Sequence, residues 1–130
     1  MGKQFVVELK NQPGSMAILA ETLAARGVDL RAIGGGGIGD SGHVIMTTAD
    51  DDTTRAVLDE GEYRYVEGES LIAEVDDKPG GMARTARALA DAGVNIHGHL
   101  FLGRWGDRAM FAFVVDNPDL ARPILERKTG

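Results

Sequence analysis

The sequence predicts an α+β protein of two ferredoxin-like units, each with the order β-α-β-β-α-β and an antiparallel sheet with helices on one face. The first reason is an internal repeat: residues 11–30 align without a gap with residues 77–96, with nine identical positions. The second reason is that each copy starts with alternating apolar and polar residues and continues with apolar residues at helical spacing. We therefore expect two related domains, residues 1–68 and 69–130.

The first strand and helix of each copy follow from local patterns. Phe5, Val7 and Leu9 alternate with Glu8 and Lys10, which indicates a strand with one buried face. Pro13 comes next, and its fixed φ and missing amide hydrogen suit the change from strand to helix. Apolar residues recur at helical spacing over residues 16–23, and Gly27 is the expected C′ residue of that helix. The second copy repeats this pattern from residue 71 to Gly93.

Two strands, a short helix and a closing strand complete the first copy. The strands are predicted at residues 28–33 and 42–49, and the glycine-rich residues between them are expected to form a flexible hairpin loop. A helix over residues 52–61 begins after a run of aspartates, which stabilise a helix N-terminus. Residues 63–68 are predicted to form the closing strand.

The second copy lacks a counterpart of that closing strand. Its strands are predicted at residues 94–103 and 108–115, and its last helix at residues 117–128. With an offset of 66 residues, its last residue corresponds to Arg64 (130 − 66 = 64). The missing strand would leave one edge of the second sheet unpaired. We expect the strand to be supplied in trans, most simply by a homodimer.

Composition and charge exclude several classes of protein. The chain has 14 basic and 20 acidic residues, so it repels nucleic-acid backbones and anionic lipids in general. It has no cysteine, which removes disulfides, thiolate metal sites and cysteine nucleophiles and fits a reducing cytoplasm. No apolar run is long enough to span a bilayer. We expect a cytoplasmic protein that acts without nucleic acid or membrane.

Three motifs suggest other functions on first reading. Gly34, Gly36 and Gly39 have dinucleotide-binding spacing, but a strand rather than a helix is predicted after them. His97 and His99 share one face of a strand and could hold a metal ion, so a metal-binding module is an alternative. The sequence has no third ligand in register with them. The aromatic strand "FAFVV" occupies the place of the RNA-binding aromatics in RNA recognition motifs, but its basic-glycine lead is absent. We expect no metal, cofactor or catalytic residue.

The repeated motif resembles the ACT domain, a module that senses amino acids and is attached to many metabolic enzymes. The segments "VVELKNQPGSMAILAETLAARGVDL" and "IAEVDDKPGGMARTARALADAGVNI" carry an apolar strand, a polar Pro-Gly loop, a helix that begins with a bulky residue, and a Gly-Val entry into the next strand. The resemblance covers nearly the whole chain as a tandem pair. It implies ligand binding where two ACT units meet, through the loop after the first strand and the start of the second strand.

The resemblance points to one set of residues in each copy. The first set is Asn11, Gln12, Pro13, Gly14, Ser15, Met16, Asp29 and Leu30, and the second is Asp77, Lys78, Pro79, Gly80, Gly81, Met82, Asn95 and Ile96. Unpaired amides at a helix start supply hydrogen-bond donors for the carboxylate of an amino acid. Side-chain oxygens of Asn11, Asp29, Asp77 and Asn95 supply acceptors for its ammonium. The same loop residues also fit ordinary turn and capping roles.

We therefore expect a regulatory protein that binds a small amino acid or a related metabolite and modulates a partner enzyme, a partner regulator or its own oligomeric state. The competing hypothesis is a protein-interaction or oligomerisation module that recruits a partner through the open sheet edge without any ligand.

Overall fold

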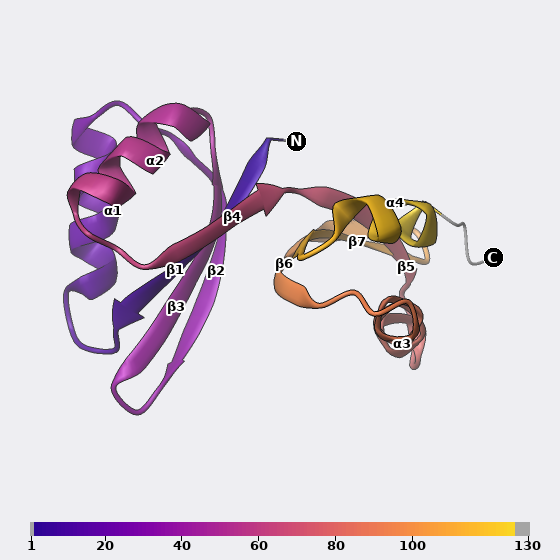
Figure 1. Ribbon diagram of the computed structural model, residues 1–130. Helices are drawn as coiled ribbons and strands as arrows, with labels where there is room; N and C mark the ends of the chain where they lie inside the picture. The colour runs from indigo at the N-terminus through magenta and orange to yellow at the C-terminus, as the bar shows by residue number, and fades with distance from the viewer. Residues whose placement is uncertain (1, 127–130) are drawn as a thin grey trace. The chain divides into compact units, whose positions relative to one another are not determined.

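The computed structural model describes residues 2–126 and divides the chain into two compact units (Figure 1). The first unit comprises residues 2–67, and the second begins at Gly68. Each unit has its own sheet and its own pair of helices. The two units are therefore described separately.

The first unit has the order β-α-β-β-α-β, and its helices α1 and α2 cover one face of its sheet (Figure 1). The second unit has the order β-α-β-β-α over the described residues. The elements are β1 (Lys3–Lys10), α1 (Ser15–Ala25), β2 (Leu30–Ile38), β3 (Ser41–Thr48), α2 (Asp51–Glu60), β4 (Tyr65–Glu69), β5 (Leu71–Asp76), α3 (Gly81–Asp91), β6 (Ile96–Trp105), β7 (Arg108–Val115) and α4 (Pro118–Leu125). These elements confirm the predicted pair of α+β units. The predicted end of the last helix, residues 127 and 128, lies outside the described residues.

The two sheets have the same strand order up to the closing strand. The first sheet runs β2-β3-β1-β4, and the second runs β5-β7-β6. The inner strand β3 of the first sheet and the central strand β7 of the second each pair antiparallel with both of their neighbours. In the part of the chain that the structure describes, no strand follows α4, so β5 pairs only with β7.

The glycine-rich segment is a strand and not the flexible loop that its composition predicts. Residues 34–37 belong to β2, and each of these glycines pairs with a residue of β3. The turn is confined to Gly39 and Asp40 between β2 and β3. Main-chain pairing along β3 outweighs the low strand propensity of glycine, because a glycine loses no ladder hydrogen bond.

The helices α1 and α3 begin and end in the same way. Gly14 and Gly80 are their N-cap residues, with φ of 92° and 89°, a left-handed conformation that only glycine adopts readily. At the C-terminus of α1, Gly27 has a φ of 74° and the amide of Val28 donates to the carbonyl of Leu23 at 3.0 Å. This is a Schellman motif, and α3 repeats it at Gly93. The predicted C′ role of Gly27 and Gly93 is confirmed.

A separate apolar core holds each unit together. In the first unit, Phe5 and Val7 of β1 pack with Leu19 and Leu23 of α1 and with Leu58 of α2. The second core places the aromatic ring of Phe113 among aliphatic side chains of β5, α3 and α4, namely Leu71, Ala73, Leu89, Ala121 and Leu125. The alternation predicted for the first strand of each copy is therefore the alternation of core and surface residues.

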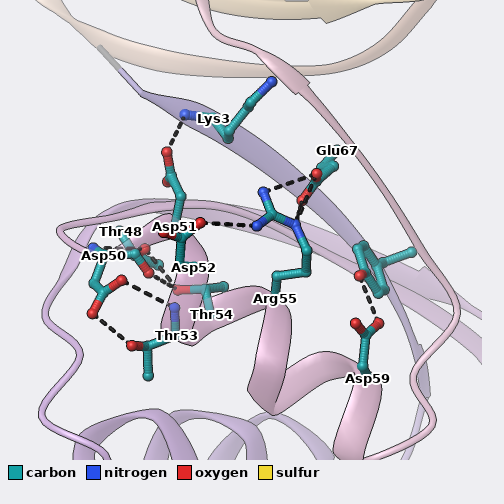
Figure 2. Close-up of polar contacts among 11 residues, drawn as sticks. Lys3, Thr48, Asp50, Asp51, Asp52, Thr53, Thr54, Arg55, Asp59 and Glu67 are labelled. Carbon is teal, nitrogen blue, oxygen red and sulfur yellow. Dashed lines mark hydrogen bonds and ion pairs between the residues drawn. The ribbon is translucent and has the colours of Figure 1, made fainter.

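Polar contacts fix α2 against the sheet of the first unit (Figure 2). Asp50 is the N-cap of α2, and its carboxylate accepts hydrogen bonds from the amide of Thr53 at 3.0 Å and from its hydroxyl at 2.6 Å. Arg55 of α2 contacts Glu67 of β4 at 3.0 Å and Asp52 at 3.0 Å. The aspartate run is therefore a helix cap, as its position predicts.

No helix among the residues that the structure describes is long and apolar enough to cross a bilayer.

The N-cap should make the stability of the protein sensitive to acid. Hydrogen bonds from the Thr53 side chain and amide lower the pKa of Asp50 below its usual value of 3.8. Because the pKa of Asp50 is lower in the folded state, its ionised carboxylate stabilises the fold at pH values above the unfolded-state pKa. This contribution is lost as the pH falls through the folded-state pKa. We expect Asp50→Asn to keep a cap without this titration. In urea melts, the stability difference between the wild type and Asp50→Asn should shrink between about pH 5 and pH 3, and a constant difference would contradict this expectation.

A second pH dependence should appear in base. The hydroxyl of Tyr65 donates to Asp59 Oδ1 at 2.7 Å, and this bond raises the pKa of Tyr65 to about 12. The neutral phenol therefore stabilises the fold at pH values below the unfolded-state pKa of about 10, and the contribution is lost as pH rises toward 12. Ultraviolet difference spectroscopy on the Tyr63→Phe variant isolates this residue. Adding Asp59→Asn should bring the transition to lower pH, and an unchanged transition would rule out Asp59 as the cause.

Candidate functional site

The turn between β1 and α1 is built by main-chain hydrogen bonds. The amide of Asn11 donates to the carbonyl of Asp40 at 2.9 Å, which ties the turn to the β2–β3 hairpin. The amide of Gln12 then donates back to the carbonyl of Lys10 at 3.0 Å. Gly14 completes the reversal in its left-handed conformation, so the chain enters α1 beside the end of β2.

The start of α1 presents hydrogen-bond donors. No side chain caps this helix start. The amide of Ser15 donates to the carbonyl of Gln12 at 3.4 Å, whereas the amides of Met16 and Ala17 have no acceptor among the described residues. Unpaired amides and the positive end of the helix dipole together favour an anionic group at this position.

Two glycines of β2 allow close approach of neighbouring groups. A Cβ atom on Gly35 would lie 2.1 Å from the carbonyl oxygen of His43. A Cβ atom on Gly37 would lie 2.6 Å from the side-chain amide carbon of Asn11. Glycine at these two positions lets β3 and the Asn11 side chain pack closely against β2 beside the β1–α1 turn.

A cavity of about 430 Å³ lies beside the β1–α1 turn. Its wall has three parts: the β1–α1 turn with the start of α1, the glycine run of β2, and the facing ends of β1 and β3. The lining residues are Asn11, Gln12, Ser15, Met16, Ile33, Gly34, Gly35, Gly36, Gly37, Leu9, Lys10, Gly42, His43 and Val44. The volume lies within the range of natural small-molecule sites, about 300–1,000 Å³.

The charge of the cavity is positive. The described residues that line it include Lys10 and His43 but no aspartate or glutamate. Asn11 Nδ2 donates to the carbonyl of Gly39 at 2.9 Å, so the side chain of Asn11 already helps to hold the hairpin. The arrangement suits the carboxylate of a small ligand, with amide and hydroxyl groups of the turn as further partners.

A second hollow lies on the β4 side of the same turn and has a different chemistry. It measures about 480 Å³ and is lined by Lys10 and Arg64 together with the carboxylates Glu8, Asp40 and Glu62. All five side chains belong to exposed residues. Mixed exposed charges of this kind are ordinary surface, so the first cavity, which most of the predicted turn residues line, is the candidate site.

The structure brings together four residues of the first predicted set. Asn11, Gln12, Ser15 and Met16 all line the cavity. Pro13 and Gly14 do not line it, but they form the turn that positions the others. Met16 is 49% exposed, so this residue, predicted as part of the apolar helix stripe, faces the cavity more than the core.

Asp29 and Leu30 lie at the other end of the sheet. Ser41 pairs with both Lys10 and Ile38, so the end of β1 meets the end of β2 and not its start. Asp29 instead contacts Arg31 at 3.4 Å, and Leu30 packs against the first core. The first unit alone does not bring these two residues to the cavity, and their part in ligand binding stays a prediction.

The second predicted set occupies an equivalent turn whose groups already have partners. Asp77 contacts the guanidinium of Arg104 at 2.8 Å. Gly80 is the left-handed N-cap of α3, and a Cβ atom on Gly81 would lie 2.0 Å from the carbonyl oxygen of Asp76. The amide of Lys78 donates to that same carbonyl at 2.9 Å. Close packing of the chain therefore accounts for the glycine at position 81, where the first copy has Ser15.

The remaining members of the second set have structural contacts or exposed positions. The amide of Asn95 donates to Asp116 Oδ1 at 2.9 Å, which joins the start of β6 to the end of β7. Ile96 packs against the second core, whereas Met82 is 36% exposed at the start of α3. Pro79 precedes the N-cap of that helix, as Pro13 does in the first copy.

Residues that the sequence reasoning missed form much of the cavity wall. Gly34 to Gly37 line it as part of a strand, together with Lys10 and His43. The glycine run was visible in the sequence, but its composition indicated a loop. Lys10 and His43 carry no local pattern, since only the pairing of β1 with β3 brings them to this place.

The described residues contain no group of three or more histidine, aspartate or glutamate side chains that could hold a metal ion. His99 instead contacts the ring of Phe113, with the ring centroids 6.4 Å apart.

Comparison with known proteins gives structural matches only. No protein-family model matches the sequence, and no curated protein sequence matches it. Protein BT0572 from Bacteroides thetaiotaomicron is similar in structure, with a TM-score of 0.70, 21% identity, and coverage of 96% of this chain and 86% of that one. The regulatory subunit of aspartate kinase from Thermus flavus follows, with a TM-score of 0.64, 17% identity, and coverage of 95% and 89%.

The ligand-free regulatory subunit of aspartate kinase from Thermus thermophilus has a TM-score of 0.59 and 20% identity, with coverage of 95% of this chain and 87% of that one. These matches extend over both units. Within this chain, the turns from β1 into α1 and from β5 into α3 carry the repeated Pro-Gly motif. The chain therefore has the fold of a tandem pair of ACT domains, as the repeated motif predicts.

Proposed function

We propose that this protein is a regulatory module that binds a small amino acid or a related metabolite in the cavity of the first unit. The observation that carries the proposal is the 430 Å³ cavity formed by the β1–α1 turn and the glycine run of β2. The resemblance of the motif and the fold of aspartate kinase regulatory subunits support the same assignment. We propose no chemistry on the ligand.

The chemistry of the cavity wall fits one end of an amino acid well. The amide of Met16 and the ammonium of Lys10 supply a donor and positive charge for a carboxylate. Apolar side chains at Leu9, Ile33 and Val44 offer contacts for a small side chain. Millimolar to micromolar binding needs about 4–8 kcal/mol, so several of these groups must act together.

Regulation would follow from linkage between ligand binding and assembly. A ligand shifts an equilibrium only by the difference in its affinity for the two states. We propose that the chain forms a homodimer and that the ligand favours one arrangement of the assembled units. A regulated enzyme or regulator is the partner that this model requires.

The alternative function is a protein-interaction module, and one observation favours it. Over the described residues, β5 pairs with β7 alone, so its other edge has no strand beside it. Such an edge can accept an added strand from another chain through main-chain hydrogen bonds. This function requires no small molecule, which separates it from the first in a binding experiment.

Thermal-shift screening with the twenty amino acids distinguishes the two functions. A ligand present at 100 times its dissociation constant stabilises the folded protein by about 2.7 kcal/mol, which gives a clear rise in Tm. At least one amino acid should produce such a rise. If none does while the protein is folded, the ligand-binding function is wrong and the interaction module is favoured.

Gly37→Val tests the position of the site. Its side chain would enter the space beside the Asn11 amide, which sits at the flexible end of a side chain and can move. We expect affinity for the amino acid found in the screen to fall by about tenfold or more, a loss of roughly 1.4 kcal/mol. Ile38→Ala is the control on the same strand, because Ile38 is 90% exposed and does not line the cavity. Equal affinity of both variants in calorimetry would place the site elsewhere.

A further inference from the structure

In each unit, the turn from the first strand into the first helix and the facing end of the strand hairpin form a corner. The corner of the second unit can be compared, position by position, with the corner of the first unit that contains the cavity. The amide of Asp77 donates to the carbonyl of Asp107 at 2.8 Å, as the amide of Asn11 donates to that of Asp40. Arg104 pairs with Ala109, one step before the last pair of its hairpin. Gly37 holds the same place in the first hairpin, because it pairs with Gly42. Arg104 is therefore the structural counterpart of Gly37.

A guanidinium group lies in the second unit at the position where the first unit has a glycine packed against the Asn11 side chain. Arg104 Nε is 2.8 Å from the carboxylate of Asp77, the counterpart of Asn11. The guanidinium also lies over the ring of Phe101, with 4.8 Å from its central carbon to the ring centroid. Phe101 pairs with Phe111 as Gly35 pairs with Val44, so an aromatic ring replaces a glycine of the cavity wall. The indole of Trp105 then covers Gly103.

The other arginines near this turn pair with Asp76, so Arg104 is the arginine that contacts Asp77. The neighbouring carboxylate, Asp76, contacts Arg108 of β7 and also Arg84 of α3 at 3.1 Å. These pairs join the end of β5 to the central strand and to the first turn of α3. In the first unit the counterpart of Asp76 is Lys10, so its charge is reversed. The second corner is thus an acidic site neutralised by the chain itself.

We propose that the second unit contains a guanidinium-binding site, formed by the carboxylate of Asp77 and the ring of Phe101, which Arg104 occupies in cis. A carboxylate and an aromatic face are the two partners that a guanidinium prefers. Because Arg104 is tethered beside the site, its effective concentration there exceeds that of free cations. Free ligands are excluded while the Arg104 side chain is in place.

The two corners then have different roles. Combined with the proposed function, on which this consequence rests, the inference predicts one amino-acid site per chain, in the first unit. The presence of Arg104 at the position of Gly37 is the difference that limits binding to the first unit. The second unit retains the same turn and helix start, but the Arg104 side chain occupies the position beside this turn.

Removal of the Arg104 side chain should open the site to an external guanidinium. Arg104 is 62% exposed, so Arg104→Ala leaves the core intact. L-arginine is the probe, and the fluorescence of Trp105, the single tryptophan, is the signal. We expect saturable binding to Arg104→Ala with a dissociation constant on the order of 0.1 M, the scale that one exposed ion pair and one exposed cation–π contact give together. The wild type should show no saturable change at the same ionic strength.

Two controls make the result specific to the proposed contacts. L-citrulline has the same length but an uncharged ureido group in place of the guanidinium, and it should not bind. Adding Asp77→Asn to Arg104→Ala should abolish the response to L-arginine, and chemical shifts of the 77–82 turn in NMR spectra should confirm its place. Saturable shifts of the 77–82 turn in the wild type would show that Arg104 does not occupy the site. No binding to Arg104→Ala would show that the site does not exist.

The reciprocal exchange tests the consequence for stoichiometry. Asn11→Asp with Gly37→Arg transfers the pair to the first unit and should remove the Tm rise found in the amino-acid screen. Retention of that rise would contradict the inferred closing role of the arginine. If the screen shows no hit but Arg104→Ala binds L-arginine, the proposed function fails and the guanidinium site stands.

Discussion

The sharp turn from the first strand of each unit into its first helix is the constraint on which the site depends. Gly14 and Gly80 adopt a left-handed conformation there, and amides of the turn donate to the neighbouring hairpin. This geometry sets the helix start beside the end of an edge strand with its first amides unpaired. Without it, neither a helix start with unpaired amides nor a cavity would lie at the edge of the sheet.

The residues opposite that turn decide what each corner contains. In the first unit, glycines at positions 34–37 bring no side chains, and a cavity of about 430 Å³ remains. In the second unit, Phe101 and Arg104 stand at equivalent positions, and the guanidinium reaches Asp77. A duplicated backbone therefore supports two different chemistries, because main-chain hydrogen bonds fix the turn while side chains alone fill or empty the space.

Much of the fold could be predicted from the chain itself, because its determinants are local. The alternation at β1, the apolar spacing of α1 and the Gly27 C′ position all report short-range preferences that the structure obeys. The glycine run was misjudged as a loop for the same reason. Its strand conformation comes from pairing with β3, a long-range contact that local composition does not reveal.

The sequence by itself determined the duplication, the order of elements and the turn residues of the site, since each of these is encoded in neighbouring positions. Only the tertiary structure decided which residues face one another across that turn. Gly37 meets Asn11, and Arg104 meets Asp77, through strand registers that no local pattern specifies. Asp29 was placed away from the cavity in the same way, because antiparallel pairing puts the start of β2 at the opposite end of the sheet.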